Sequence, residues 1–406
     1  MWPFSRKTEQ RSEVAVAQSD PEFLRAFGLA DWVATGSGES VTIETALGVP
    51  AIFSAVNFLS STVAGLPLGV YRKTENGREK AGGSLAAILN GVANDEAAIS
   101  AFDLFKWWME QALTGGRGVL FIDRDGTGLV KNLWPLDPAK LTIKRKDGRR
   151  EYHYRDGKPV IYQAADVLDL PFMLKADCLG HRSPIMANRE VIGMAQAMTR
   201  YGGSFFRNGG VPPFAVTGNF QSGNALKRAA DDFDEAVRKT AKEARQALVL
   251  PTGLEIKPIG ADPDKSQMVE AQRFMIEQIA RIYSMPPVFL QDLSHGTFSN
   301  TEQQDLHFVK HTVKRWVAQI EQELNLKLFG REPKTYAEFN LDGLLRGDFK
   351  TRMDGYAQGV QNGILTPNEA RELENRQNAA GGDRLYIQGA TVPLEQSGTQ
   401  QQGAQQ

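Results

Sequence analysis

The chain contains a single cysteine, Cys178, among 406 residues. One thiol excludes an internal disulfide framework and any zinc cluster built from several cysteines, and it is typical of a protein from a reducing compartment. The chain also lacks a surplus of either charge, with 47 Lys and Arg against 48 Asp and Glu. Because tight binding of nucleic acid through counterion release needs a surplus of cations, this balance argues against such binding for the chain as a whole and leaves only a local basic patch open.

Long apolar runs are absent from the sequence too. No stretch approaches the ~18 consecutive apolar residues of a membrane-spanning helix, and Arg6 and Lys7 are not followed by the apolar core of a secretory signal. We therefore expect no membrane contact. Residues 1–20 form a polar arm, and six of the last eleven residues are glutamine, a composition that buries too little apolar surface to fold by itself. The folded body is expected to cover about 42–393.

Nucleotide-binding motifs are missing or incomplete. The sequence has no G-x-x-x-x-G-K-[S/T] loop, which argues against an ATPase motor. Gly116-Arg117-Gly118 begins like a dinucleotide fingerprint, but Phe121 stands where the third glycine belongs. These glycines also precede a predicted strand, whereas a fingerprint follows one. We therefore expect no nucleotide cofactor.

Two pairs of residues could suggest a metal site or a nucleophile. His307 and His311 lie four residues apart on a predicted helix, yet Phe308 stands where a zinc peptidase needs glutamate, and no third ligand is evident. Cys178 and His181 lack an identifiable third group that would orient them. We therefore expect no catalytic residues, no metal and no enzymatic activity, with a metal-dependent hydrolase that uses His307 and His311 kept as an alternative.

The residues that are present indicate a globular protein of two or three structural units, with 41% hydrophobic and 23% charged residues. Apolar residues at helical spacing, together with capping residues, predict helices over 49–64, 100–114, 183–207, 224–245, 264–283, 300–328, 349–362 and 368–374. The most regular apolar stripe belongs to the helix over 300–328 and consists of Leu306, Val309, Val313, Trp316, Ile320, Leu324 and Leu328.

Between Gly118 and Pro171 the apolar residues alternate instead. Asp-Gly pairs at 125–126, 147–148 and 156–157 mark tight turns, so we expect an antiparallel region of several short hairpins. Further strands are predicted at 66–71, 214–216 and 337–339, and a hairpin is predicted to join 247–250 to 254–256. Because strands and helices do not alternate in this region, the predicted class is α+β, and the pattern argues against a doubly wound nucleotide-binding fold.

The order of these segments resembles the portal proteins of long-tailed bacteriophages and gene transfer agents. The resemblance covers roughly 42–390 and includes, for example, the passages GHRSPI and IARIYSMPPVFLQD. One departure is Gly116-Arg117, where the family usually has Gly-Asn. The segments that carry the resemblance are 51–72, 112–138, 180–185, 204–218, 248–259, 279–292, 299–325, 362–375 and 381–387.

The resemblance implies a dodecameric ring at one capsid vertex, a passive conduit for double-stranded DNA during packaging and ejection. It also implies an α+β portal fold with a wing of antiparallel hairpins and helices, a helical stem, a small α/β clip and a helical crown. Transferred to this sequence, the divisions are a flexible arm (1–41), wing (42–184 and 284–345), stem helices (185–207 and 264–283), clip (208–263), crown (346–390) and a glutamine-rich tail (391–406).

The segment 291–299 would be the loop that faces DNA in the tunnel, with Asp292, Leu293, Ser294, His295, Gly296, Thr297 and Phe298 as the DNA-facing residues. The implied partners are other copies of the chain, the major capsid protein, the large terminase subunit, a head–tail connector and DNA bound without sequence specificity. The implied location is the virion or a virus-like particle, and the bacterial host cytoplasm during assembly. A generic ring-forming adaptor is the other alternative, and a mass measurement that finds a large ring without metal would exclude the hydrolase.

Overall fold

The computed structural model describes residues 35–75, 77–207, 214–218, 223, 227–233, 235, 254–258, 265–290, 304–331, 334–341, 344, 349–374 and 376–387. Its α-helices are α3 (Ile43–Leu47), α4 (Pro50–Ala64), α5 (Ser84–Asn90), α6 (Ala101–Thr114), α7 (Pro184–Ala187), α8 (Arg189–Arg207), α10 (Lys265–Ile282), α12 (Lys314–Leu324), α14 (Phe349–Gln361) and α15 (Pro367–Leu373). Shorter helical segments are η1 (Pro138–Lys140), η2 (Ala164–Asp166), η3 (Pro287–Leu290), η4 (Phe308–Val313) and η5 (Asn325–Phe329).

All strand pairs are antiparallel, and the three larger sheets have the orders β13-β1-β2, β10-β5-β6 and β7-β8-β9. The mixture of such sheets with segregated helices confirms the α+β class. The strands are β1 (Leu68–Thr74), β2 (Gly77–Lys80), β3 (Val92–Asn94), β4 (Ile99–Ser100), β5 (Arg117–Arg124), β6 (Val130–Leu136), β7 (Leu141–Lys146), β8 (Arg149–Asp156), β9 (Lys158–Gln163), β10 (Val167–Pro171), β11 (Phe214–Gly218), β12 (Leu254–Pro258) and β13 (Thr335–Phe339).

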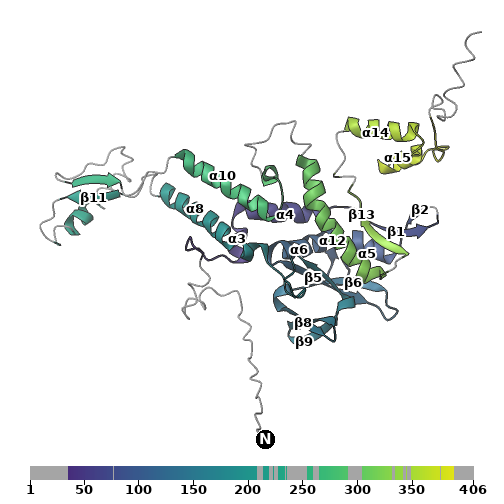
Figure 1. Cartoon of the computed structure of the whole chain (residues 1–406), viewed down its shortest axis with the longest axis horizontal. Helices are drawn as coiled ribbons and strands as arrows, with labels where there is room; N and C mark the ends of the chain where they lie inside the picture. Colours follow the sequence, from purple (N-terminus) through teal and green to yellow (C-terminus); the bar gives the residue numbers. More distant parts are fainter. Residues whose placement is uncertain are drawn as a thin grey trace, which may run out of the picture.

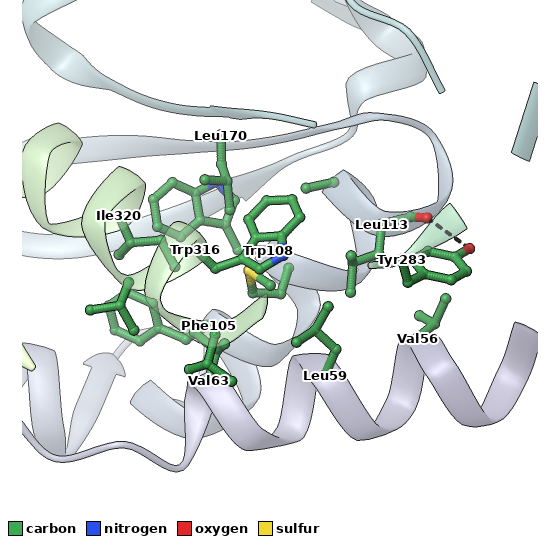
Figure 2. Packing of buried hydrophobic residues seen from close by; sticks show 14 of the residues in the cluster. Val56, Leu59, Val63, Phe105, Trp108, Leu113, Leu170, Tyr283, Trp316 and Ile320 are labelled. Carbon is green, nitrogen blue, oxygen red and sulfur yellow. Dashed lines mark hydrogen bonds between the residues drawn. The ribbon is translucent and has the colours of Figure 1, made fainter. Parts of the chain in front are cut away.

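The main core lies between α4, α6 and α12. Figure 2 shows Val56, Leu59 and Val63 projecting from one face of α4 into the cluster that also contains Trp108 of α6 and Trp316 of α12. Trp108 and Trp316 are fully buried. Burial of each large apolar side chain contributes about 1.5–3 kcal/mol, so this three-helix contact is a major source of stability.

Two helices begin at the capping residues that the sequence predicts. Ser100 accepts a hydrogen bond from the Asp103 N–H at the start of α6, and Thr366 and Glu369 form a full capping box at α15. The single helix predicted over 183–207 is wrong, because Asn188 interrupts it between α7 and α8. The Asn188 amide donates to the Pro184 carbonyl, a local bond that competes with continuation of the helix.

The structure differs in two respects from the regular helix predicted over 300–328. Residues 300–303 lie outside the described residues, and α12 is flanked by the π-helical segments η4 and η5. Since π-helical bonds run from i to i+5, the apolar face changes phase upstream of α12. Leu306 is therefore exposed, and Phe308 takes its predicted place in the core.

Strand β12 pairs with β11, with Val216 opposite Ile256. The predicted hairpin between 247–250 and 254–256 stays a prediction, because residues 247–253 lie outside the described residues. The predicted strand at 214–216 is confirmed. Of the charged helix predicted over 224–245, residues 227–233 are helical.

The elements form a body with two extensions (Figure 1). Helices α8 and α10 run side by side away from the body, and the β11–β12 sheet lies at their far end. At the other end, α14 and α15 pack against each other, and Arg352 pairs with Glu374 across them at 2.7 Å. None of the described helices is long and apolar enough to cross a membrane.

Candidate functional site

The residues predicted to face DNA, Asp292, Leu293, Ser294, His295, Gly296, Thr297 and Phe298, lie outside the described residues. The structure does describe both ends of the segment that contains them. One end is η3, which finishes at the buried Leu290, and the other is the helix that continues from residue 304 into η4. These two ends form the base of the candidate site.

An aromatic cluster holds both ends on the same face of α4. The ring centroids of Phe58 and Phe289 lie 5.4 Å apart, those of Phe58 and Phe308 5.5 Å, and those of Phe289 and Phe308 4.5 Å. Aromatic pairs at such distances contribute roughly 0.5–1.5 kcal/mol each beyond the burial of their surface. Phe58 of α4 therefore fixes where segment 291–303 leaves the core and where it returns.

Hydrogen bonds also hold the turn that leads from α10 into η3. The Tyr283 hydroxyl donates to the Leu113 carbonyl at 3.2 Å (Figure 2), and burial raises the Tyr283 pKa above its ordinary value. The Thr312 hydroxyl of η4 donates to the carbonyl of Ser284, whose φ of 54° lies in the left-handed region. The turn before segment 291–303 is thus bonded to α6, and it is also bonded to η4, which follows the segment.

The structure brings His307 and His311 together, with ring centroids 4.5 Å apart on the exposed face of this helix. No group of three or more His, Cys, Asp or Glu side chains in the described part of the chain could hold a metal ion. Cys178 is a free, exposed thiol in a turn, and the pKa of His181 is lowered by burial. No hydrogen bond between these two residues is present among the described contacts.

A ladder of polar side chains on one face of α12 and η5 covers the free edge of β10. Arg315, Gln319, Glu323 and Lys327 recur at intervals of four residues, which places them on one helix face. Glu323 Oε1 accepts the Asp169 N–H at 3.0 Å, and Gln319 Nε2 donates to the Pro171 carbonyl at 2.7 Å. Arg315 and Lys327 donate to the carbonyls of Phe172 and Ala164.

This polar ladder covers an unpaired strand edge. Strand β10 is the outer strand of the sheet β10-β5-β6, and unpaired strand edges invite pairing with other chains. The ladder supplies partners to the exposed backbone and joins α12 to the sheet. Sequence reasoning missed it, although the four-residue spacing of long polar side chains was the available signal.

A buried ion pair lies directly beneath the ladder. Arg117 Nε of β5 is 3.0 Å from Asp169 Oδ1 of β10, and their side chains are 5% and 3% exposed. The two charges face each other without the alignment of a hydrogen bond, whereas the Tyr152 hydroxyl donates to Asp169 Oδ2 at 2.9 Å. Arg117 also donates to the Leu179 carbonyl at 2.7 Å, so it tethers the loop that leads to α7.

Together these contacts link segment 291–303, the helices of the core and the sheet β10-β5-β6. The aromatic cluster joins segment 291–303 to α4, the polar ladder joins α12 to β10, and Arg117 joins the sheet to the loop before α7 and α8. The described arrangement contains ion pairs, caps and packed rings, but no nucleophile with an adjacent base. It is suited to holding the two ends of segment 291–303 on the packed core.

Comparisons with known proteins match most of the chain. The model of the family described as phage portal protein matches residues 50–375. The chain is 31% identical over 356 residues to the probable portal protein of Streptomyces phage phiC31, covering 84% of this chain and 77% of that protein. It is 26% identical over 370 residues to the portal protein of Enterobacteria phage HK97, covering 89% and 86%.

A solved structure has the same fold. A chain in the neck of an empty gene transfer agent (GTA) particle superposes with a TM-score of 0.59 at 18% identity, covering 83% of this chain and 93% of that chain.

Proposed function

Because the chain belongs to the phage portal protein family, we propose that it forms a closed ring of twelve copies at one capsid vertex and conducts double-stranded DNA during packaging and ejection. The observation that supports this most is the match of the family model to residues 50–375, which run from the start of α4 to just past α15. The proposed role is structural rather than catalytic.

We assign the parts of the ring as follows. The body, 42–184 with 284–345, is the wing, and the projecting pair α8 and α10 is the stem. Segment 208–263, with the β11–β12 sheet, is the clip, and segment 346–390, with α14 and α15, is the crown. The support is the arrangement in Figure 1, in which a helical pair separates a small sheet from the body and a helical unit lies at the opposite end.

Segment 291–299 is proposed to line the narrowest part of the tunnel. The support is the base of this segment, since Phe58, Phe289 and Phe308 hold both of its ends on the packed core. A loop that contacts moving DNA must resist displacement at its ends. Its contacts to DNA should be weak and directed at phosphates, because base contacts would make passage depend on sequence.

The proposed partners are the major capsid protein, the large terminase subunit and a head–tail connector. A separate terminase supplies the energy, which agrees with the lack of a phosphate-binding loop in this sequence. The protein is proposed to assemble in the bacterial cytoplasm and to remain at the portal vertex of the particle.

Native mass spectrometry of the purified protein tests the proposal. A closed head-to-tail ring has a defined copy number, so we expect one dominant assembly of twelve copies without stoichiometric metal. Monomers and dimers alone at micromolar concentration would contradict the ring. Bound zinc that is lost in the His307→Ala, His311→Ala variant would instead favour the hydrolase.

A further inference from the structure

The β7–β8 hairpin ends in a strongly basic tip. Seven consecutive residues, 144–150, contain five cations and no apolar side chain: Lys144, Arg145, Lys146, Asp147, Gly148, Arg149 and Arg150. Asp147 and Gly148 have φ values of 50° and 78°, and two successive left-handed residues are the signature of the type I′ turn that suits a two-residue hairpin. The tip is therefore a defined β-turn that presents its cations from two paired strands.

The strand register places like charges opposite one another. Arg145 pairs with Arg150, and Lys146 pairs with Arg149. Successive pairs lie on opposite faces of the hairpin, so one face carries Arg145 and Arg150 and the other carries Lys144, Lys146 and Arg149. Like charges directly across a strand pair are destabilising, and an anion bound from outside would relieve this repulsion.

Few anionic groups in the described part of the chain neutralise this basic tip. Lys146 approaches Glu151 at 4.0 Å with a side chain that is 70% exposed, and Arg150 lies 3.8 Å from Asp169. Lys144 and Arg149 are exposed and form no ion pair with any residue in the described ranges. The tip thus retains unbalanced positive charge.

We propose that the basic tip binds the phosphate backbone of double-stranded DNA. An acidic protein is the other partner that such charge could attract, but the centre of a protein interface is apolar and depleted of lysine. The tip offers no apolar side chain, whereas phosphate contacts need only lysine and arginine. The chain's net charge of −1 is compatible with this, since the cations are concentrated on one hairpin.

The position of the β7–β8 hairpin indicates on which side of the body the bound DNA would lie. In Figure 1, β8 and β9 lie on the side of the body opposite to α4 and α10, the helices that carry the base of segment 291–303. The hairpin is therefore remote from the base of segment 291–303. This step rests on the proposed function: in a ring, the bound duplex would lie against the outer wall of the wing rather than inside the tunnel.

The test uses purified full-length protein and a small covalently closed circular duplex, which cannot thread a closed ring. Binding is measured across a salt series for the wild type, for Lys146→Gln with Arg149→Gln, and for the control Arg72→Gln with Lys80→Gln. The control removes the same charge from the β1–β2 hairpin. We expect the basic-tip variant to bind at least tenfold more weakly at low salt, with a shallower salt dependence, while the control binds like the wild type.

The Tm and the ring mass of each variant accompany the binding measurement. Because the substitutions relieve like-charge repulsion, the Tm of the basic-tip variant should equal or exceed that of the wild type. Equal loss of binding in the control, or a lowered Tm together with lost binding, would overturn the proposal. Unchanged DNA binding combined with failure to enter capsids would identify an acidic protein as the partner instead. Failure of all three proteins to form rings would count against the proposed function, while their DNA binding would still decide this inference.

Discussion

The Arg117–Asp169 pair illustrates how a single buried contact can link distant parts of the chain. Loss of Arg117 would leave the buried Asp169 carboxylate with Arg150, 3.8 Å away and partly exposed, as its one remaining cation among the described residues. Breaking a buried pair in this way typically costs about 3–5 kcal/mol. We expect Arg117→Met to lower the free energy of unfolding by that amount in denaturant titrations. The matched control Arg78→Met breaks an exposed pair with Glu338 and should cost roughly 0–1 kcal/mol.

A double variant separates charge from packing at this position. Arg117→Met with Asp169→Leu removes both charges, and apolar replacement of a buried pair is often nearly neutral. The double variant should therefore be more stable than Arg117→Met alone. If it is less stable, the hydrogen bonds from Tyr152 and to Leu179 matter more than the buried charge.

Glu323 should make stability depend on pH. Burial raises its pKa above the ordinary value, so the folded protein holds its proton at a pH where the unfolded chain has lost it. Stability is then lost as pH rises through the window between the two values. Glu323→Gln removes this loss and keeps an oxygen that can accept the Asp169 N–H, so the variant should gain Tm relative to the wild type as pH rises toward 7.

Parallel thermal melts of both proteins from pH 4 to pH 7 check this, with the exposed Glu44→Gln as control. A Tm difference between wild type and Glu323→Gln that stays constant over the whole range would show that Glu323 titrates normally in the folded protein.

Helix α4 connects the core with the proposed tunnel loop through one side chain. Phe58→Ala removes the ring that contacts both Phe289 and Phe308, and it should lower the free energy of unfolding by about 2–3 kcal/mol. With both ends loosened, segment 291–303 should be cleaved faster in limited proteolysis followed by mass spectrometry. Phe53→Ala on the same helix is the control, because Phe53 is 58% exposed. Equal cleavage rates in the two variants would mean that the aromatic cluster does not hold the segment.

In the molecule as a whole, the packed core and the segment proposed to touch DNA are distinct parts of the chain. Deletion of residues 294–297 leaves the packed stripe of α12 and the aromatic cluster intact, so rings should still assemble. Packaging or retention of DNA should fail instead. A complementation assay that counts rings, empty heads and full heads separately measures both effects. Normal numbers of stable full heads would show that the segment does not engage DNA, and loss of rings would place it in a subunit interface.

The features that could be predicted from the sequence are those encoded by neighbouring residues. Ser100 and the Thr366–Glu369 box mark helix starts because a capping bond spans three residues, and Asp147-Gly148 marks a hairpin because both residues accept left-handed φ values. The order of such local signals was sufficient to identify the portal family and the α+β class.

Tertiary structure alone decided the features whose partners are distant in the chain. The base of the proposed tunnel loop needs Phe58, Phe289 and Phe308 to meet, although more than 200 positions separate the first from the other two. The ion pair of Arg117 and Asp169 and the bond from Asp169 to Glu323 likewise join β5, β10 and α12. No local spacing encodes these contacts, because each depends on how the sheets and helices pack once their apolar faces are buried.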